Sequence, residues 1–311
     1  MPRSAPTLAN DSFAAISPHA ERSLQASAQA VAAVLDDRGG RPLLLESVSP
    51  VLVPALRRTD PRCNALVVNW DTNPRLELTG DWEEYLGRLT GSQRADVRRL
   101  ARRGAEMQLR SVYQADEVAA STRLSLEQRR RVWSESGLAD KMSPFQRGPA
   151  WDEFLVDAAG ALAGAGLALV DELVWEGHVV ASTLWLQRGD WLLGYHRAAE
   201  RSQMKFGQIF DVLLLQDAIG RGVRTIEMGR GSEARKYHLG ATDVAVCDVV
   251  VGHARLATLA TMVARVTPFL ARRLVGRSAS RSSTAGPPPS PRTATPTTPA
   301  GPPPSAIAQD G

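Results

Sequence analysis

The sequence predicts an α+β protein whose mixed, mostly antiparallel sheet is flanked by helices. Three observations predict this class. Helical patterns fill much of 81–164, three short strands joined by tight turns follow at 167–197, and a helix and two further strands complete the pattern over 207–251. Such an order of elements is typical of helices that pack on both faces of one sheet.

The first 75 residues predict a flexible segment followed by a reduced lobe. Residues 1–20 are rich in Ser, Ala, Pro and Asn, which favours a flexible N-terminus. We expect a reduced N-terminal lobe at 21–75, beginning with an Ala-rich amphipathic helix at 21–35. The lobe's other apolar runs are short and separated by prolines, which predicts short strands or irregular connections. These runs are 43–45, 51–56 and 65–70.

The first half of the predicted main domain, 76–252, is mostly helical. Asp81 is suited to cap a helix, since its carboxylate can accept a free backbone N–H group. Gly104 and Gly137 end two further helical patterns. The predicted elements are helices at 81–86, 92–103, 116–136 and 151–164 and a strand at 107–112.

The second half of this domain carries the clearest pattern. Glu176-Gly177 is a tight hairpin signal between two apolar runs, and Arg188-Gly189-Asp190 is a second turn, so we expect a three-stranded meander. A polar loop at 198–206 precedes the next helix. The predicted elements are strands at 167–175, 178–186 and 191–197, a helix at 207–221, and strands at 223–228 and 244–251.

The C-terminal region predicts one helix and a disordered tail. Apolar residues recur at helical spacing over 254–274, with arginines beside them, which predicts an amphipathic helix within 253–276. Such a helix either docks its apolar stripe on the domain or makes weak contact with an anionic membrane surface. Residues 277–311 are dominated by Pro, Ser and Thr and lack the apolar content of a core, so we expect disorder.

Charge and cysteine content exclude several functions. The formal net charge is +4, but 252–311 holds seven Arg and only one acidic residue, Asp310; it carries +6 and leaves −2 for the rest. A slightly acidic globular part disfavours nucleic acid as a partner. The two cysteines, Cys63 and Cys247, lack metal-ligand spacing, which disfavours a metal site and fits a reducing compartment. With no signal peptide or membrane-spanning run, we expect a cytoplasmic protein, peripheral at most to the inner face of the membrane.

The region from Trp191 onward resembles the GNAT superfamily of acyltransferases. It is most similar to the branch that contains the CelD-like proteins of polysaccharide biosynthesis and the FemAB-type peptidoglycan transferases. Earlier pieces also match, namely the helix from Asp81, the Arg-rich helix that follows and Trp133, so that the resemblance covers about 75–245. The matching segments are 177–181, 194–196, 207–222, 226–231 and Lys236.

The resemblance implies a GNAT-like N- or O-acyltransferase. Acetyl-CoA or another acyl-CoA would be the donor, and the acceptor would be a small molecule or a glycan precursor of envelope polysaccharide synthesis. The thioester would lie in a cleft between the third meander strand and the strand that starts at Val223, and the acceptor would attack it directly. Two alternatives remain: a FemAB-type transferase that uses aminoacyl-tRNA, and a GNAT-fold scaffold without catalysis.

The start of the helix near Gly207 is the predicted donor site. A helix N-terminus presents free backbone N–H groups and partial positive charge, which suit a pyrophosphate. Lys205 adds a cation there, although an ordinary strand-to-helix loop with a surface lysine would have the same sequence. The predicted donor-binding residues are Lys205, Phe206, Gly207 and Gln208.

Three residues are candidates for proton transfer. Glu227 ends a predicted strand and would accept the proton of an attacking amine if partial burial raised its pKa, but it would serve equally in an ion pair with Arg224 or Arg230. By the resemblance, Tyr195 faces the cleft and Tyr237 protonates the departing thiolate. A core position is the alternative for Tyr195.

Three further residues are predicted to bind substrate. Arg230 and Lys236 have the charge to hold an anionic acceptor or the donor phosphates, yet solvated surface cations have the same sequence. Trp133 would line an acceptor groove, by the resemblance, or pack in the core. The residue before Lys236 is Arg235, where the family usually has an aromatic residue.

Overall fold

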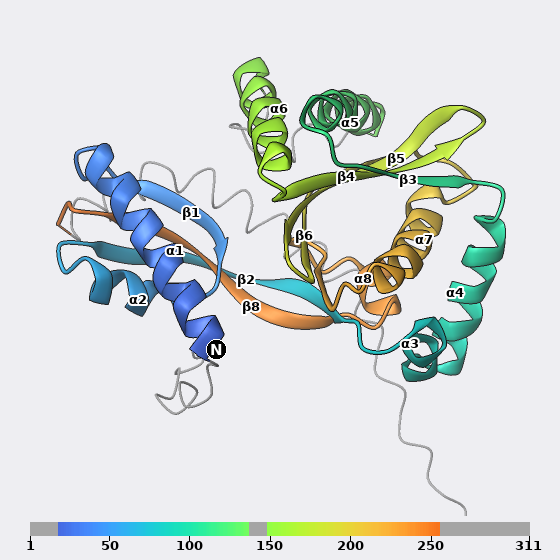
Figure 1. Ribbon diagram of the computed structural model, residues 1–311, viewed down its shortest axis with the longest axis horizontal. Coiled ribbons are helices and arrows are strands. Elements are labelled where there is room, and N and C mark those ends of the chain that lie inside the picture. The colour runs from blue at the N-terminus through green and yellow to red at the C-terminus, as the bar shows by residue number, and fades with distance from the viewer. Residues whose placement is uncertain (1–17, 137–147, 256–311) are drawn as a thin grey trace, which may run out of the picture. The chain divides into compact units, whose positions relative to one another are not determined.

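The computed structural model describes residues 18–136 and 148–255, all within the first of the chain's two compact units. Figure 1 shows the helices and strands of this unit. Most of the expected N-terminal flexible segment, nearly all of the amphipathic helix at 253–276 and the tail at 277–311 lie outside the described residues. Among the described helices, none is both long enough and apolar enough to cross a bilayer.

The described strands form one eight-stranded sheet in the order β1-β8-β2-β7-β6-β5-β4-β3. All neighbours are antiparallel except β6 and β7, which run parallel. The mixed, mostly antiparallel sheet is therefore confirmed. The strands are β1 Leu43–Val48, β2 Asn64–Glu77, β3 Gln108–Val112, β4 Ala168–Trp175, β5 His178–Arg188, β6 Trp191–Ala199, β7 Thr225–Glu227 and β8 Thr242–Gly252.

Helices cover both faces of the β3–β6 part of this sheet (Figure 1). On one face, α5 and α6 pack on the strands around Val170 and Leu184. On the other, α7 and α4 pack around Trp185 and Phe210. The remaining helices lie beside β1, β2 and β8 or in the connections. The helices are α1 Pro18–Asp37, α2 Leu52–Thr59, α3 Trp82–Arg88, α4 Gly91–Arg103, α5 Ala115–Glu135, α6 Pro149–Gly164, α7 Phe206–Gly220 and α8 Ala234–His238.

Local sequence signals explain where several elements begin and turn. Asp81 caps α3 by accepting from the N–H of Glu84, as predicted. Glu176 and Gly177 both have positive φ (49° and 79°), the conformation that a two-residue hairpin requires between strands of right-handed twist. The predicted meander β4–β5–β6 is confirmed with both of its turns.

Three predictions for the connections need correction. The apolar run 51–56 is helical, since it belongs to α2; Pro54 lies in the first turn, where a missing N–H group leaves no intrahelical bond unmade. β2 extends to Glu77 and passes through the predicted boundary at residue 75, so the first lobe and the main domain share one sheet. The five-residue α8 was not predicted, because it is too short for a periodic pattern.

Gly104 fixes how closely α4 approaches α7. A Cβ atom at this position would lie 2.8 Å from Cγ2 of Ile209 and 2.9 Å from Cδ1 of Leu213, closer than carbon atoms pack. We expect Gly104→Ala to lower the free energy of unfolding by about 1–3 kcal/mol. Gly220→Ala is the matched control, because a Cβ there meets nothing within 4 Å, and alanine in a helix should stabilise by about 0.5–1 kcal/mol. Urea unfolding of both variants tests this, and equal stabilities would contradict the packing.

Candidate functional site

The first turn of α7 has main-chain N–H groups that make no hydrogen bond to the described residues. Lys205 precedes the helix in a left-handed conformation (φ 59°), and its side chain does not cap the helix. Its carbonyl oxygen accepts from the N–H groups of Gln208 and Ile209, but those of Phe206 and Gly207 have no acceptor among the described residues. Two N–H groups at a helix N-terminus are thus free to bind an anion.

The side chains of the four predicted donor-binding residues diverge. Lys205 and Gln208 are exposed, whereas the Phe206 ring is buried and packs against Trp175, with 5.3 Å between ring centroids. Gly207 is half-buried, and its carbonyl accepts a hydrogen bond of 2.7 Å from Arg197. Phe206 therefore anchors the turn in the core while its neighbours face outward.

A cavity of about 280 Å³ opens beside this turn, between α4, the start of α7 and α8. We call it the α4–α7–α8 cavity. The sequence predicted a cleft between β6 and β7, whereas this cavity lies among the helices α4, α7 and α8. Its polar lining comes from Asp96, Arg99, Lys205, Gln208, Asp211, Arg235 and His238.

The charge of this cavity is positive because two guanidinium groups share one buried carboxylate. The Asp211 side chain is only 4% exposed and accepts from Arg197 (2.5 Å) and Arg235 (2.8 Å). Asp96 pairs with Arg99 at 2.9 Å, which lowers the pKa of its carboxyl group. Lys205 adds a further cation. The lining residues together with Arg197 therefore carry more positive than negative charge, which favours an anionic ligand.

β6 and β7 pair over only three residues and then separate. The last parallel partners are Leu193 and Glu227. Beyond them β6 continues to Ala199, whereas the segment after β7 turns away at Gly229 (φ 74°). Tyr195 is an extra residue opposite β5, because Leu184 pairs with His196. Among the described strands, none therefore pairs with the second half of β6 on the β7 side.

Glu227 and Arg230 each belong to an internal polar network. Glu227 accepts from Asn73 (2.6 Å) and Arg75 (2.5 Å), so its ion-pair partner is Arg75 rather than Arg224 or Arg230. Arg230 binds Asp248 through both terminal nitrogens and also contacts Asp71 and Ser47. These contacts occupy the polar atoms of both side chains within the sheet.

Lys236 and Tyr237 also make internal contacts. The Lys236 residue is 1% exposed, and its ammonium group donates to the carbonyl oxygens of residues 229, 230 and 231 at 2.8–3.1 Å and pairs with Glu233 at 2.8 Å. Tyr237 donates to Asp243 at 2.6 Å, and burial together with this carboxylate raises the pKa of Tyr237 to about 12. Lys236 thus holds the loop after β7 in place.

Comparison with known proteins identifies the central part of the chain. Residues 91–237 match the sequence model of a family described as acetyltransferase (GNAT) domain. This segment is GNAT-like, and we refer to residues 91–237 as the GNAT domain. This segment runs from the start of α4 into α8 and includes every wall of the α4–α7–α8 cavity except Leu239 and His238. No curated protein shows significant sequence similarity to the chain.

Several solved structures are similar to this chain at low sequence identity. The structure of L-PGS from Bacillus licheniformis is 15% identical, with 79% of each chain covered and a TM-score of 0.49. The C-terminal domain of a putative lysylphosphatidylglycerol synthetase from Agrobacterium fabrum is 16% identical, with 77% of each chain covered and a TM-score of 0.47. A GCN5-related N-acetyltransferase from Kribbella flavida is 14% identical, covers 76% of this chain and 77% of its own, and has a TM-score of 0.35.

The other two predicted residues are absent from the lining of the α4–α7–α8 cavity. Trp133 is half-buried on α5, and the guanidinium of Arg129 lies 4.5 Å from its ring centroid. Tyr195 is 46% exposed, and burial of its hydroxyl and the nearby charge of Glu46 raise its pKa. The structure therefore brings Lys205 and Gln208 together at the cavity and places Trp133 and Tyr195 elsewhere.

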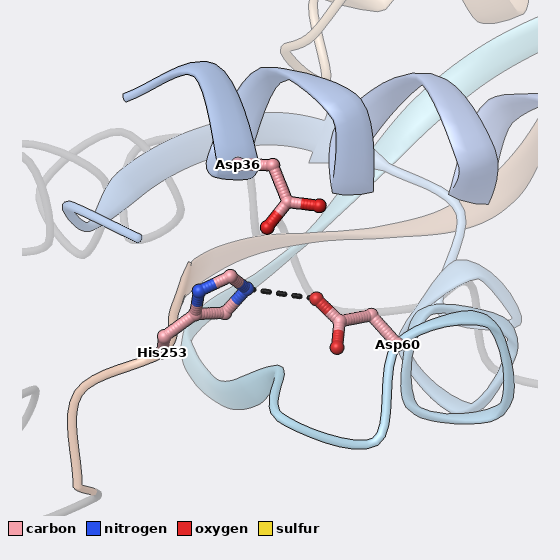
Figure 2. Close-up of side chains that lie close together, drawn as sticks. All are labelled: Asp36, Asp60 and His253. Atoms are coloured by element: carbon pink, nitrogen blue, oxygen red, sulfur yellow. Dashed lines mark hydrogen bonds and ion pairs between the residues drawn. The ribbon is translucent and has the colours of Figure 1, made fainter. Parts of the chain in front are cut away.

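Outside the GNAT domain, Asp36, Asp60 and His253 offer ligand atoms within 4.8 Å of one another (Figure 2). Arg62 binds both carboxylates, at 2.7 Å from Asp36 and 3.0 Å from Asp60, and His253 contacts Asp60 at 2.7 Å. Hydrogen bonds from Arg62, with a smaller contribution from His253, lower the pKa of Asp60 to about 2. A guanidinium already supplies the positive charge here, so the group ties α1, the turn before β2 and the end of β8 together.

Proposed function

We propose that the GNAT domain transfers an acyl group from a coenzyme A thioester, such as acetyl-CoA, to an amine or hydroxyl. The observation that carries this proposal is the pair of free N–H groups of Phe206 and Gly207 beside a positively charged cavity. Phosphate groups of the donor would bind these N–H groups and Lys205, since a helix N-terminus and a cation together favour a doubly charged anion.

The separation of β6 and β7 supplies the second half of the proposed mechanism. Main-chain groups of β6 beyond Leu193 have no strand partner on that side, so N–H groups remain to bind the thioester oxygen as it becomes negative. The acceptor nitrogen or oxygen forms a bond to the acyl carbon and gives up one proton to solvent. The carbon–sulfur bond breaks, and the sulfur leaves as a thiolate that takes up one proton. Positioning of the two substrates would provide most of the rate acceleration.

One of the predicted proton-transfer residues, Tyr195, stays in this proposal. Tyr195 lies two residues beyond Leu193, where β6 and β7 part, and its side chain is exposed. Both carboxylate oxygens of Glu227 are committed to Asn73 and Arg75, so we propose no proton transfer by Glu227. Tyr237 is committed to Asp243, so we propose no catalytic role for it. Arg230 and Lys236 are proposed to shape the loop at 229–231 rather than to touch a substrate.

A ligand panel tests the donor. We expect thermal stabilisation by at least one coenzyme A thioester and acyl transfer to a small-molecule or glycan-precursor amine or hydroxyl, read by mass spectrometry. Lys205→Gln should weaken donor binding roughly fivefold, about 1 kcal/mol, because an exposed cation makes a modest contribution. Arg102→Gln, an exposed change on α4 away from the cavity lining, should not.

The same panel separates the alternatives. Stabilisation and turnover with aminoacyl-tRNA but with no thioester would replace this proposal by a FemAB-type transferase. Failure of every donor to bind at millimolar concentration would contradict the proposal and favour a scaffold. Preference for a glycan precursor as acceptor would support a role in envelope polysaccharide synthesis at the inner membrane face.

A further inference from the structure

Three consecutive arginines on α5 differ in their charge partners. Arg130 pairs with Asp152 at 2.6 Å, and Arg131 pairs with Glu200 at 2.7 Å. Arg129 has no carboxylate within ion-pair distance among residues 18–136 and 148–255. Of this run, Arg129 is therefore the cation whose charge the described protein leaves uncompensated.

Arg129 is nevertheless held in a defined, half-buried position. Its guanidinium lies over the ring of Trp133, 4.5 Å from the centroid, and its NH1 nitrogen is 3.3 Å from Nδ1 of His196. Burial and the charge of Arg129 lower the pKa of His196 to about 3, so the imidazole is neutral near pH 7 and supplies no opposite charge. A partly desolvated cation with no anion is costly to a fold, which points to a function.

Strand β6 lies between Arg129 and the proposed donor site. His196 and Arg197 are adjacent on β6 and therefore face opposite sides of the sheet. His196 contacts Arg129 on the α5 side, whereas Arg197 contacts Asp211 and Gly207 on the α7 side. Both contacts come from the stretch of β6 that has already separated from β7.

We propose that Arg129, supported by Trp133, binds an oxyanion of the acyl acceptor, either a carboxylate or a phosphate. The guanidinium is planar, and its Nε and NH2 make no hydrogen bond to residues 18–136 or 148–255, so they offer the fork geometry that matches two oxygens of such a group. The acceptor is then an amine- or hydroxyl-bearing molecule that also carries a negative charge. This inference rests on the proposed function for the identity of the ligand, but not for the existence of the anion site.

Nuclear magnetic resonance of arginine side chains tests the site without any assumption about activity. The Nε–Hε signal that disappears in Arg129→Lys belongs to Arg129. Inorganic phosphate and acetate are titrated separately at constant ionic strength. At least one of them should shift this signal saturably, whereas chloride should not. The control is the Nε–Hε signal of the exposed Arg123 on the same helix, which is assigned by its loss in Arg123→Gln. This signal should show no saturable shift in the wild-type protein. If neither oxyanion moves the Arg129 signal, the proposal is overturned.

Kinetics then test the link to the acceptor. Arg129→Gln should raise KM for acceptors that carry a carboxylate or phosphate about 10- to 100-fold, the range for a hydrogen-bonded charged group, with a small change in kcat. KM for neutral acceptors should stay the same, and Arg123→Gln should behave as wild type. An equal loss for charged and neutral acceptors would overturn the assignment.

Stability and donor controls keep the outcomes distinct. The melting temperature of Arg129→Gln should not fall, since the change removes an uncompensated cation; a marked fall would show that Arg129 serves the fold and would contradict the proposal. Phosphate should still move the Arg129 signal in Lys205→Gln, which separates this site from the donor site. If no acyl transfer is found with any donor, the proposed function fails while the titration still decides whether the anion site exists.

Discussion

Asp211→Asn is expected to destabilise the GNAT domain by about 3–5 kcal/mol, because it removes the buried carboxylate that pairs with two partly buried guanidinium groups. Arg197 and Arg235 would then lose their shared ion-pair partner near the start of α7. Arg197 would also lose the contact that positions it to bind the carbonyl of Gly207, which disturbs the turn that presents the free N–H groups. Donor binding should therefore fall together with stability.

Urea unfolding followed by circular dichroism measures the first effect. Asp96→Asn is the matched control, since Asp96 lines the same cavity but its side chain is 44% exposed and pairs within one turn of α4. The control should change stability by no more than about 1 kcal/mol. A loss of similar size in both variants would mean that the buried carboxylate has no special role.

Lys236→Met should lower the free energy of unfolding by about 2–4 kcal/mol, because three carbonyl oxygens and Glu233 lose their common donor. The loop at 229–231 follows the end of β7, where β6 and β7 part, so its displacement should also reduce turnover. A lysine that bound substrate at the surface, as the sequence suggested, would leave stability unchanged and reduce turnover alone.

The exposed Lys205 provides the comparison for Lys236. Lys205→Met should change stability by less than about 0.5 kcal/mol, as expected for a surface substitution, and should weaken donor binding instead. The two lysines are thus expected to separate a fold effect from a binding effect. Equal unfolding curves for both variants would contradict the structural role of Lys236.

Local signals explain why much of the fold was predictable. Gly177 and Gly189 mark turns whose positive φ values few other residues adopt readily, so the meander could be placed within one or two residues. Asp81 and the Thr90 capping box fix two helix starts in the same way. The extent of β2 was not predictable, because polar residues along its second half pair with β8 rather than form a connection.

The site was predictable only where it depends on one segment. The free N–H groups at Phe206 and Gly207 follow from a loop-to-helix junction, which the sequence shows. The triad of Arg197, Asp211 and Arg235 joins β6, α7 and α8, and such contacts between distant segments leave no pattern in a single sequence. One signal was available: an aspartate within the otherwise apolar run 209–215 indicates a buried, paired carboxylate. Lys236 gave no such signal.

The most direct test follows the backbone amide signals of Phe206 and Gly207 while coenzyme A is titrated into the protein. If the first turn of α7 holds the donor phosphates, both amides should shift saturably, and the shifts should require a higher coenzyme A concentration in Lys205→Gln. Binding of coenzyme A that leaves both amides unmoved, or moves only residues remote from the α4–α7–α8 cavity, would contradict the donor site on which the proposed transfer depends.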